Sequence, residues 1–450
     1  MRDSDHIHPD FKPLPYWWEA APPDAAGDLS PPDQVDVAIV GGGYTGLNAA
    51  LELARGGRSV VVCEAGLFGD GASSRNGGGV SAGINLGKGM SGGPGEQSNR
   101  AEGRSLLERL MGESRQAFDL VGDLVEREAI DCHYQQTGRM VGAITPAHFE
   151  KFRARAETIN RLTDAGASVL PRERLREEMD SDFYHGGLVI ERAARLHPAL
   201  YLRGLREAAA RAGALLCANT RVEAVHGQPG SFEVLTGKGQ VRIAEVVIGT
   251  NGYTGPLTPG LQRGVVPAAS HIIATEPLPP ALVSSLIPKA RTLSETPRIL
   301  HYYRQSPDGR RLVFGGRARF TDVDARTRAR LLRKAMLARF PQLADARITH
   351  SWTGLVAFTQ DALPHIGMHQ GMHYALGCNG SGVAMMSYLG NLIGRRILRS
   401  NDVHSAYLDL PLPDVPVPGY RGKPWFLPLV GGWYRFLDRV DRLRGEMRRT

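Results

Sequence analysis

The sequence has few cysteines, few lysines and no long apolar run. Its cysteines are scattered without paired spacing, which excludes a disulfide framework and a cysteine-based metal site and favours a reducing, cytoplasmic setting; they are Cys63, Cys132, Cys217 and Cys378. No window approaches the roughly 20 consecutive apolar residues that a membrane-spanning helix needs. The first residues, MRDSDHIHPDFKPLP, lack the apolar core of a secretory signal. We therefore expect neither a spanning helix nor a signal peptide.

The net charge of +8 comes almost wholly from arginine, since only seven lysines are present. Over much of the chain the arginines alternate with acids, as in REAAARAG and RERLREEMD. That alternation is typical of solvated helix faces and argues against nucleic acid as a partner. With 450 residues, 42% hydrophobic and 22% charged, the chain fits two or three compact units.

A glycine-rich turn lies between an apolar strand and an amphipathic helix near the N-terminus. Residues 35–57 read VDVAIVGGGYTGLNAALELARGG and contain G-x-G-x-x-G. Such glycines allow a tight turn and close approach of a pyrophosphate, while the helix N-terminus attracts the anion. Glu64 ends the next apolar run, where an acid can accept the ribose hydroxyls. We expect a dinucleotide against Gly41, Gly43, Tyr44, Thr45, Gly46 and Glu64.

A second run of small residues follows soon afterwards. Residues 69–79 read GDGASSRNGGG, and eight of these eleven are Gly, Ala or Ser. A nicotinamide enzyme would continue with further strand–helix repeats, whereas this loop can lay bare backbone against a large flat ligand. An isoalloxazine with its ribityl chain is such a ligand. The second loop therefore predicts FAD rather than NAD.

These motifs resemble the D-amino-acid-oxidase-like family of FAD-dependent oxidoreductases, in particular its γ-glutamylputrescine oxidoreductase-like branch. The segments that carry the resemblance are PYWW (15–18), GASSRNGG (71–78) and PVPGYRGKPW (416–425). The resemblance implies that the second loop lies beside the flavin, through Ala72, Ser73, Ser74, Arg75, Asn76, Gly77 and Gly78. For Arg75 and Asn76 the alternative is a loop-stabilising pair with no ligand contact. Some relatives attach FAD covalently through a His or a Cys. Neither residue occurs between Glu64 and Asn85, so we predict non-covalent FAD.

Three later segments agree with the resemblance. Val222 would meet the adenine through its backbone, or else be a core valine, and the turn at Thr250, Asn251 and Gly252 would cross the cofactor again. Residues 359–367 match T-x-D-x-x-P-x-I-G, and GCNGSGV precedes an apolar helix. The helix N-terminus would stabilise negative charge on reduced flavin. This segment adds the candidates Gly377, Asn379, Gly380, Ser381, Gly382 and Val383. Cys378-Asn379 and Ser381 depart from the family pattern, and we interpret Cys378 as a packing residue.

The expected fold is α/β. It combines a Rossmann-type, glutathione-reductase-like FAD-binding domain with an α+β substrate domain built on an antiparallel sheet. The predicted boundaries are an N-terminal lead at 1–32, the FAD-binding domain at 33–100, 190–260 and 350–400, the substrate domain at 101–189 and 261–349, and a basic tail at 401–450.

The reaction expected from the resemblance is oxidation of the C–N bond of an amine or amino acid, with hydride transfer to flavin N5 and hydrolysis of the imine. The family needs no dedicated base, so we assign no catalytic residue and no metal. Aromatic residues could bind an amine, and an arginine could hold a carboxylate. Pocket candidates are Tyr253, His271, Tyr302, Tyr303, Arg317 and Trp352, each of which could instead be structural.

The electron acceptor and the tail remain open in the sequence. Sarcosine-oxidase relatives carry a lysine over the flavin on a strand that RRLVFGGR resembles; our alignment puts Val313 at that place, with Arg310, Arg311 or Arg317 as substitutes. The acceptor is thus oxygen or a quinone or carrier protein. The tail reads as a basic amphipathic helix that either packs on the body or touches a membrane. Alternative functions are a tailoring enzyme of a biosynthetic pathway and a non-catalytic FAD-binding subunit.

Overall fold

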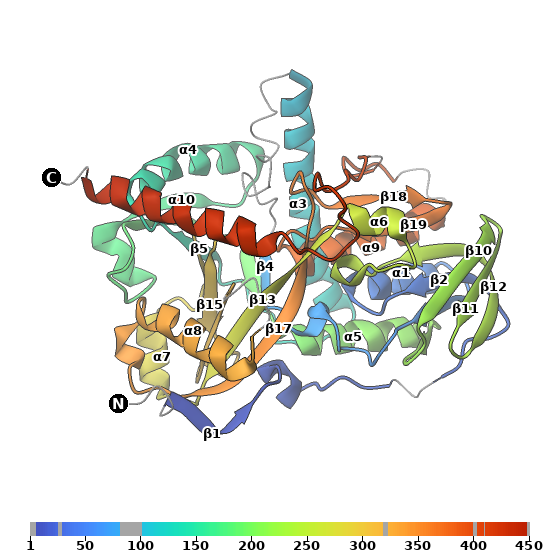
Figure 1. The fold of residues 1–450 in the computed structure, drawn as a ribbon, viewed down its shortest axis with the longest axis horizontal. Coiled ribbons are helices and arrows are strands. Elements are labelled where there is room, and N and C mark those ends of the chain that lie inside the picture. The colour runs from blue at the N-terminus through green and yellow to red at the C-terminus, as the bar shows by residue number, and fades with distance from the viewer. Residues whose placement is uncertain are drawn as a thin grey trace.

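The computed structural model describes residues 6–25, 29–81, 101–317, 323–398, 403–408 and 410–447. In this part of the chain the strands form two large sheets, which occupy the two halves of the molecule in Figure 1. Within the same residues, no helix is long and apolar enough to cross a membrane.

The first sheet, called here the Rossmann sheet, is parallel at its centre. Apolar runs form its buried strands, because a parallel sheet is covered on both faces. Its parallel strands, in spatial order, are β9 (Leu215–Cys217), β3 (Val60–Cys63), β2 (Gln34–Val40), β12 (Gly239–Ile248) and β19 (Met372–Leu376). β10 (Val222–Gln228) and β11 (Ser231–Thr236) extend it as an antiparallel meander on β12, and β18 (His365–His369) pairs with β19.

Helices with apolar faces cover the Rossmann sheet. α1 (Tyr44–Arg55) begins directly after β2 and packs on α9 (Gly382–Ile397) and on α5 (Pro198–Arg211). α3 (Ala101–Arg127) packs on the outer side of α9. Close α1–α9 packing depends on Gly390, where a Cβ would lie 2.2 Å from the Thr45 carbonyl oxygen. The first turn of α1 thereby packs against the middle of α9.

The second sheet, called here the mixed sheet, has mostly antiparallel pairing. In spatial order it runs β1 (Ile7–Lys12), β17 (Ile348–Phe358), β13 (Val266–Thr275), β16 (Leu312–Gly316), β15 (His301–Gln305), β14 (Thr292–Glu295), β5 (Arg139–Gly142), β7 (Gly186–Ile190) and β6 (Ala167–Pro171). The end pair β1–β17 and the pair β14–β5 are parallel. Thus the N-terminal lead (residues 1–32) contributes β1 to this sheet, and the start of the segment 350–400, which we assigned to the FAD-binding domain, contributes most of β17. A short sheet pairs β4 (Gly79–Ser81) with β8 (Ala193–Arg195).

Helices flank the mixed sheet. α8 (Ala325–Leu337) packs on β13, β16 and β17, and α4 (Pro146–Leu162) packs on β6 and β7. The short helices α6 (Pro259–Arg263) and α7 (Pro280–Leu286) lie in its connections. α10 (Leu427–Met447) crosses in front of the strands beside α4 (Figure 1). Arg298 fixes it to the body by ion pairs to Asp438 (3.1 Å) and Asp441 (2.8 Å). The described part of the tail therefore packs on the body.

Candidate active site

A cavity of about 1430 Å³ lies between the two sheets. Its walls come from the turn after β2, the second small-residue loop, the N-terminus of α9 and one face of the mixed sheet, with α4 and α10 at the far end. A space of this size can hold a dinucleotide and a small substrate together.

The turn after β2 has the geometry that a pyrophosphate cradle needs. Gly41 has a φ of +103°, which L side chains rarely adopt. At Gly46 a Cβ would lie only 2.0 Å from the Gly41 carbonyl oxygen, so glycine is required for α1 to start this close to the strand. The N-cap of α1 is Gly43, which has no side chain to cap the first-turn N–H groups. Apart from the Tyr44 N–H, which donates to Ser73 Oγ, these groups and the helix dipole are left for an anion.

Glu64 lies at the carboxyl end of β3 and lines the same cavity. Its Oε2 accepts the Gly42 N–H at 2.8 Å and its Oε1 accepts the Gly66 N–H at 3.2 Å. These bonds fix the carboxylate beside the turn, and each oxygen retains a lone pair for a further donor. A ribose hydroxyl is a suitable donor at that place.

The two small-residue loops form one hydrogen-bonded unit. Ser73 accepts the Tyr44 N–H through its Oγ at 3.2 Å, and its carbonyl accepts the Tyr44 hydroxyl at 2.5 Å. The Asn76 amide donates to the Ser73 carbonyl at 2.9 Å and accepts the Gly78 N–H at 2.8 Å. The pKa of Tyr44 is raised by burial, so the phenol stays a donor. The second loop therefore has a fixed backbone shape along the cavity wall.

Two tryptophans of the lead hold the second loop from behind, a role that we did not predict for PYWW. The Trp17 indole N–H donates to the Asn76 carbonyl, and the Trp18 indole N–H donates to Ser74 Oγ, both at 2.9 Å. Trp17 is fully buried. No local pattern in the sequence connects residues 59 positions apart, so only the resemblance of the lead could have marked it.

The side chains of Arg75 and Asn76 serve the loop itself. Arg75 donates to the Asp70 carbonyl at 2.7 Å and to the Thr353 carbonyl at 3.3 Å, and its guanidinium lies 4.5 Å from the Trp18 ring centre. Both residues also line the cavity. The contacts match the loop-stabilising alternative for the side chains, while the backbone remains available to a ligand.

A third glycine-rich turn precedes α9. Gly377 and Gly380 have φ values of +84° and +88°. The Asn379 side chain accepts the Thr359 N–H at 3.1 Å and donates to the Gly377 carbonyl at 2.8 Å, so it ties this turn to the end of β17. Asn251 accepts the Gly377 N–H at 3.0 Å. The turn presents the N-terminus of α9 to the cavity.

Most of the predicted cofactor residues line this cavity. They are Gly41, Gly43, Tyr44, Thr45, Glu64, Ala72, Ser73, Arg75, Asn76, Gly77, Val222, Thr250, Asn251, Gly252, Asn379, Gly380, Ser381, Gly382 and Val383. Gly46, Ser74, Gly78 and Gly377 lie behind the wall and shape the turns. The cradle, the acid and the second loop fit an FAD molecule along one continuous wall.

On the side of the mixed sheet, Tyr302 covers the second loop. A Cβ at Gly77 would lie 3.0 Å from the Tyr302 ring and one at Gly315 would lie 2.4 Å from it, so both glycines admit the ring. The Tyr302 hydroxyl bonds to Ser270 Oγ at 2.9 Å. Arg317 lines the cavity with its guanidinium 4.6 Å from the Phe358 ring centre, and burial lowers its pKa. Tyr253 and Val313 also line the cavity.

Several predicted pocket residues lie elsewhere. Strand alternation places His271 on the face of β13 opposite to that of the cavity-lining Ser270. The His271 side chain is buried there and bonds to Thr353 Oγ1 at 2.8 Å. Trp352 donates its indole N–H to the Arg75 carbonyl at 2.8 Å and so supports the loop. Arg311 donates to the Thr275 carbonyl at 2.6 Å, and neither it nor Arg310 lines the cavity. Of the three arginines proposed for the lysine position, Arg317 faces the cavity.

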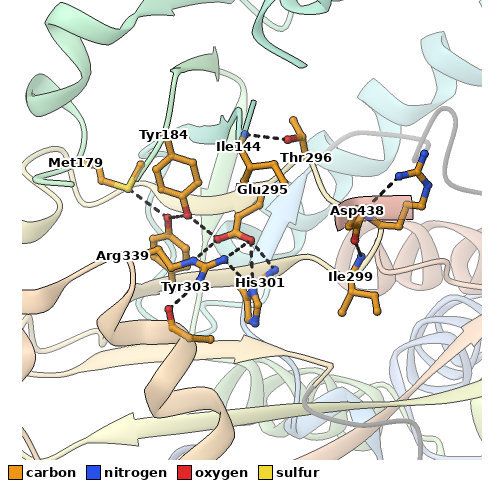
Figure 2. A network of polar contacts seen from close by, with 12 residues as sticks. Ile144, Met179, Tyr184, Glu295, Thr296, Ile299, His301, Tyr303, Arg339 and Asp438 are labelled. Carbon is orange, nitrogen blue, oxygen red and sulfur yellow. Dashed lines mark hydrogen bonds and ion pairs between the residues drawn. The ribbon is translucent and has the colours of Figure 1, made fainter. Parts of the chain in front are cut away.

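Tyr303 lines the cavity but belongs to a buried polar network on the other side of its strand, shown in Figure 2. Its hydroxyl bonds to that of Tyr184 at 2.7 Å, and Tyr184 donates to Glu295 at 2.6 Å. Arg339 Nε donates to Glu295 at 2.6 Å. Burial alone would raise the pKa of Glu295, but His301 and Arg339 outweigh it and hold the pKa at about 2. The network fixes the end of β14, whose Ser294 lines the cavity.

Comparison with known proteins identifies the family. The family model described as FAD dependent oxidoreductase (DAO) matches residues 36–396. A probable oxidoreductase OrdL of Rhizobium meliloti (strain 1021) is 31% identical over 94% of this chain and 97% of its own. γ-Glutamylputrescine oxidoreductase of Escherichia coli (strain K12) is 31% identical over 90% and 93%. The crystal structure of L-proline dehydrogenase from P. horikoshii shares the fold, with a TM-score of 0.67, 18% identity and coverage of 89% and 99%.

Fold and site together define an FAD-dependent oxidoreductase. The chain belongs to the DAO family of FAD-dependent oxidoreductases. The family and the fold class that the sequence motifs predicted are thereby confirmed.

Proposed function

We propose that this enzyme oxidises the C–N bond of an amine or amino acid. The observation that carries the proposal is the continuity of the cavity, which joins the dinucleotide cradle at Gly41 and Glu64 to a pocket lined by Tyr302 and Arg317. When bound, FAD supplies the electron acceptor for a hydride from the carbon next to the amine nitrogen, leaving an imine that water hydrolyses. The names of the E. coli and P. horikoshii proteins, an amine and an amino-acid oxidoreductase, support this substrate class.

The residues of the chain hold and orient the reactants. The N-terminus of α1 would bind the pyrophosphate, Glu64 the adenosine ribose, and residues 72–78 the ribityl chain and flavin ring. The dipole of α9 would favour negative charge at its end of the ring. Tyr302 would position the amine against the second loop, and Arg317 would bind a carboxylate close to the reacting carbon. No general base is assigned.

An anaerobic amine panel tests this function. The purified enzyme is mixed without oxygen with primary, secondary and amino-acid amines while the oxidised-flavin band near ~450 nm is followed. Bleaching by at least one amine is the expected result. A yellow protein that no amine bleaches, although dithionite reduces it, would overturn the proposal.

We further propose that FAD is bound without a covalent link, and that acid precipitation of the enzyme releases all of the flavin into solution.

The electron acceptor is oxygen or a quinone or carrier protein. No lysine occurs in β16, the strand that resembles the one on which sarcosine-oxidase relatives place a lysine over the flavin, and Arg317 is the cation that could replace it. Reoxidation of the bleached enzyme by air and by a soluble quinone, compared as rate constants, separates the two acceptors.

We also propose that the enzyme is cytoplasmic and that the outer face of α10 contacts an anionic membrane surface. The four cysteines are free thiols, as expected in a reducing compartment. Leu429 and Phe436 on α10 are 72% and 55% exposed and do not line the cavity, and they lie beside the exposed Arg435 and Arg439. Asp438 and Asp441 of this helix turn inward to Arg298, so the outer face around Leu429 and Phe436 is apolar and basic, as on interfacial helices.

A further inference from the structure

The cavity continues past Tyr302 to a second, basic end. β5 contributes Arg139 to its wall and α4 contributes His148, Lys151 and Arg155. These α4 residues recur at a spacing of three and four positions, so one face of the helix lines the cavity. Among the described residues, the carboxylates that line the cavity are Glu64, Asp70 and Glu223, which belong to the dinucleotide end. The basic end is therefore electropositive.

Arg139 and Arg155 are the informative pair. Arg139 makes one long contact, 3.5 Å from its Nη2 to Ser294 Oγ. In the described part of the chain, neither arginine forms an ion pair with a carboxylate, whereas Arg298 nearby is paired with Asp438 and Asp441. Burial and then the charge of Arg155 lower the pKa of Arg139 to about 10, so the Arg139 guanidinium remains charged near neutral pH; burial also lowers the pKa of Arg155.

Two like charges held together in a half-buried cavity destabilise each other, and an anion between them removes that cost. Planar guanidinium groups bind carboxylates by two parallel hydrogen bonds. We propose that Arg139 and Arg155 bind a carboxylate of the substrate that is remote from the amine being oxidised. The proposal rests on the function proposed above and narrows its substrate class.

The sheet register sets the length of that substrate. Tyr302 is paired with Ser294, and Ser294 with Val141, so Arg139 lies two strands and two residues away from Tyr302. With strands ~4.8 Å apart and a rise of ~3.3 Å per residue, the Cα atoms of Tyr302 and Arg139 are about 12 Å apart. An α-amino acid carries its carboxylate on the reacting carbon and cannot span this distance. A chain of several carbon atoms between amine and carboxylate can span it, since the arginine side chain also reaches inward.

The test compares 6-aminohexanoate with hexylamine, which lacks the carboxylate. The ratio of their kcat/KM values is measured for the wild type and for Arg139→Gln, Arg155→Gln and the charge-retaining Arg139→Lys. Loss of one charge-assisted contact should lower the preference for 6-aminohexanoate about tenfold to a hundredfold in the Gln variants, and less in Arg139→Lys. Arg153→Gln is the matched control, because Arg153 is exposed on α4 and does not line the cavity. It should leave the ratio unchanged.

A binding measurement separates this proposal from the proposed function. Calorimetric titration with hexanoate, which has no amine, should show binding to the wild type that Arg139→Gln weakens. If hexanoate binds in this way although no amine bleaches the flavin, the anion site stands and amine oxidation falls. If amines bleach the flavin but the wild type shows no preference for the remote carboxylate, or the Gln variants keep it, the anion site is refuted.

Discussion

Gly46 gives the sharpest prediction about the cofactor site. A Cβ at this position would lie 2.0 Å from the Gly41 carbonyl oxygen and 3.0 Å from Ile39 Cγ2, where ordinary contacts begin at 3.4 Å. The neighbour at 2.0 Å is backbone and cannot rotate away, so in Gly46→Ala the start of α1 must move by roughly 1 Å. Because the first-turn N–H groups of α1 are the expected pyrophosphate ligands, this shift separates them from the anion.

The expected result for Gly46→Ala is an FAD dissociation constant raised about tenfold to a hundredfold, from an overpacking cost of ~1–3 kcal/mol. The assay is titration of the apoprotein with FAD, followed by flavin fluorescence, together with the flavin content of the purified enzyme. Gly112→Ala is the matched control, since a Cβ there meets no described atom within 4 Å and alanine suits the interior of α3. A Gly46→Ala enzyme that binds FAD as tightly as the wild type would refute the assignment of this turn.

Three further predictions follow from the supports around the cavity. Trp17→Phe removes the hydrogen bond to the Asn76 carbonyl and should destabilise the second loop by about 1 kcal/mol, seen as a lower flavin content and melting temperature; Trp425→Phe, at an exposed indole that does not line the cavity, should leave both unchanged. The pKa of Glu295 is about 2, below its ordinary 4.5. Its contribution of about 3 kcal/mol to the free energy of unfolding is therefore present above pH 4.5 and is lost as the pH falls toward 2. Glu295→Gln should flatten the dependence of stability on pH in that range, and an unchanged profile would contradict the network. Phe436→Asp should abolish sedimentation with phosphatidylserine vesicles, whereas equal binding of both proteins would reject α10 as the contact.

Local patterns in the sequence account for the cofactor half of the molecule. Gly41, Gly46 and Glu64 lie within a single strand–helix–strand unit, so their spacing already specifies their geometry. The second loop is equally local, and most of its residues line the cavity. In each case, the residues that predict the ligand lie close to one another in the sequence.

The substrate half could not be predicted in the same way. His271 and Ser270 are neighbours on β13, a strand with mostly buried residues, so alternation separates their faces without indicating which one meets the cavity. Arg139 reaches the wall only because β5 pairs with β14, some 150 residues later in the chain. The helix α10 joins the site through Arg298 and Asp438, which are 140 residues apart. These contacts depend on long-range pairing that leaves no local pattern.

The central claim is that one cavity brings FAD and an amine together for oxidation. It is tested most directly by an anaerobic single turnover in which flavin bleaching and the released carbonyl product are measured in the same sample. We predict that one carbonyl group is formed per flavin reduced and that an amine with a remote carboxylate gives the fastest bleaching. Bleaching without a carbonyl product, or a flavin that stays oxidised with every amine, would contradict it.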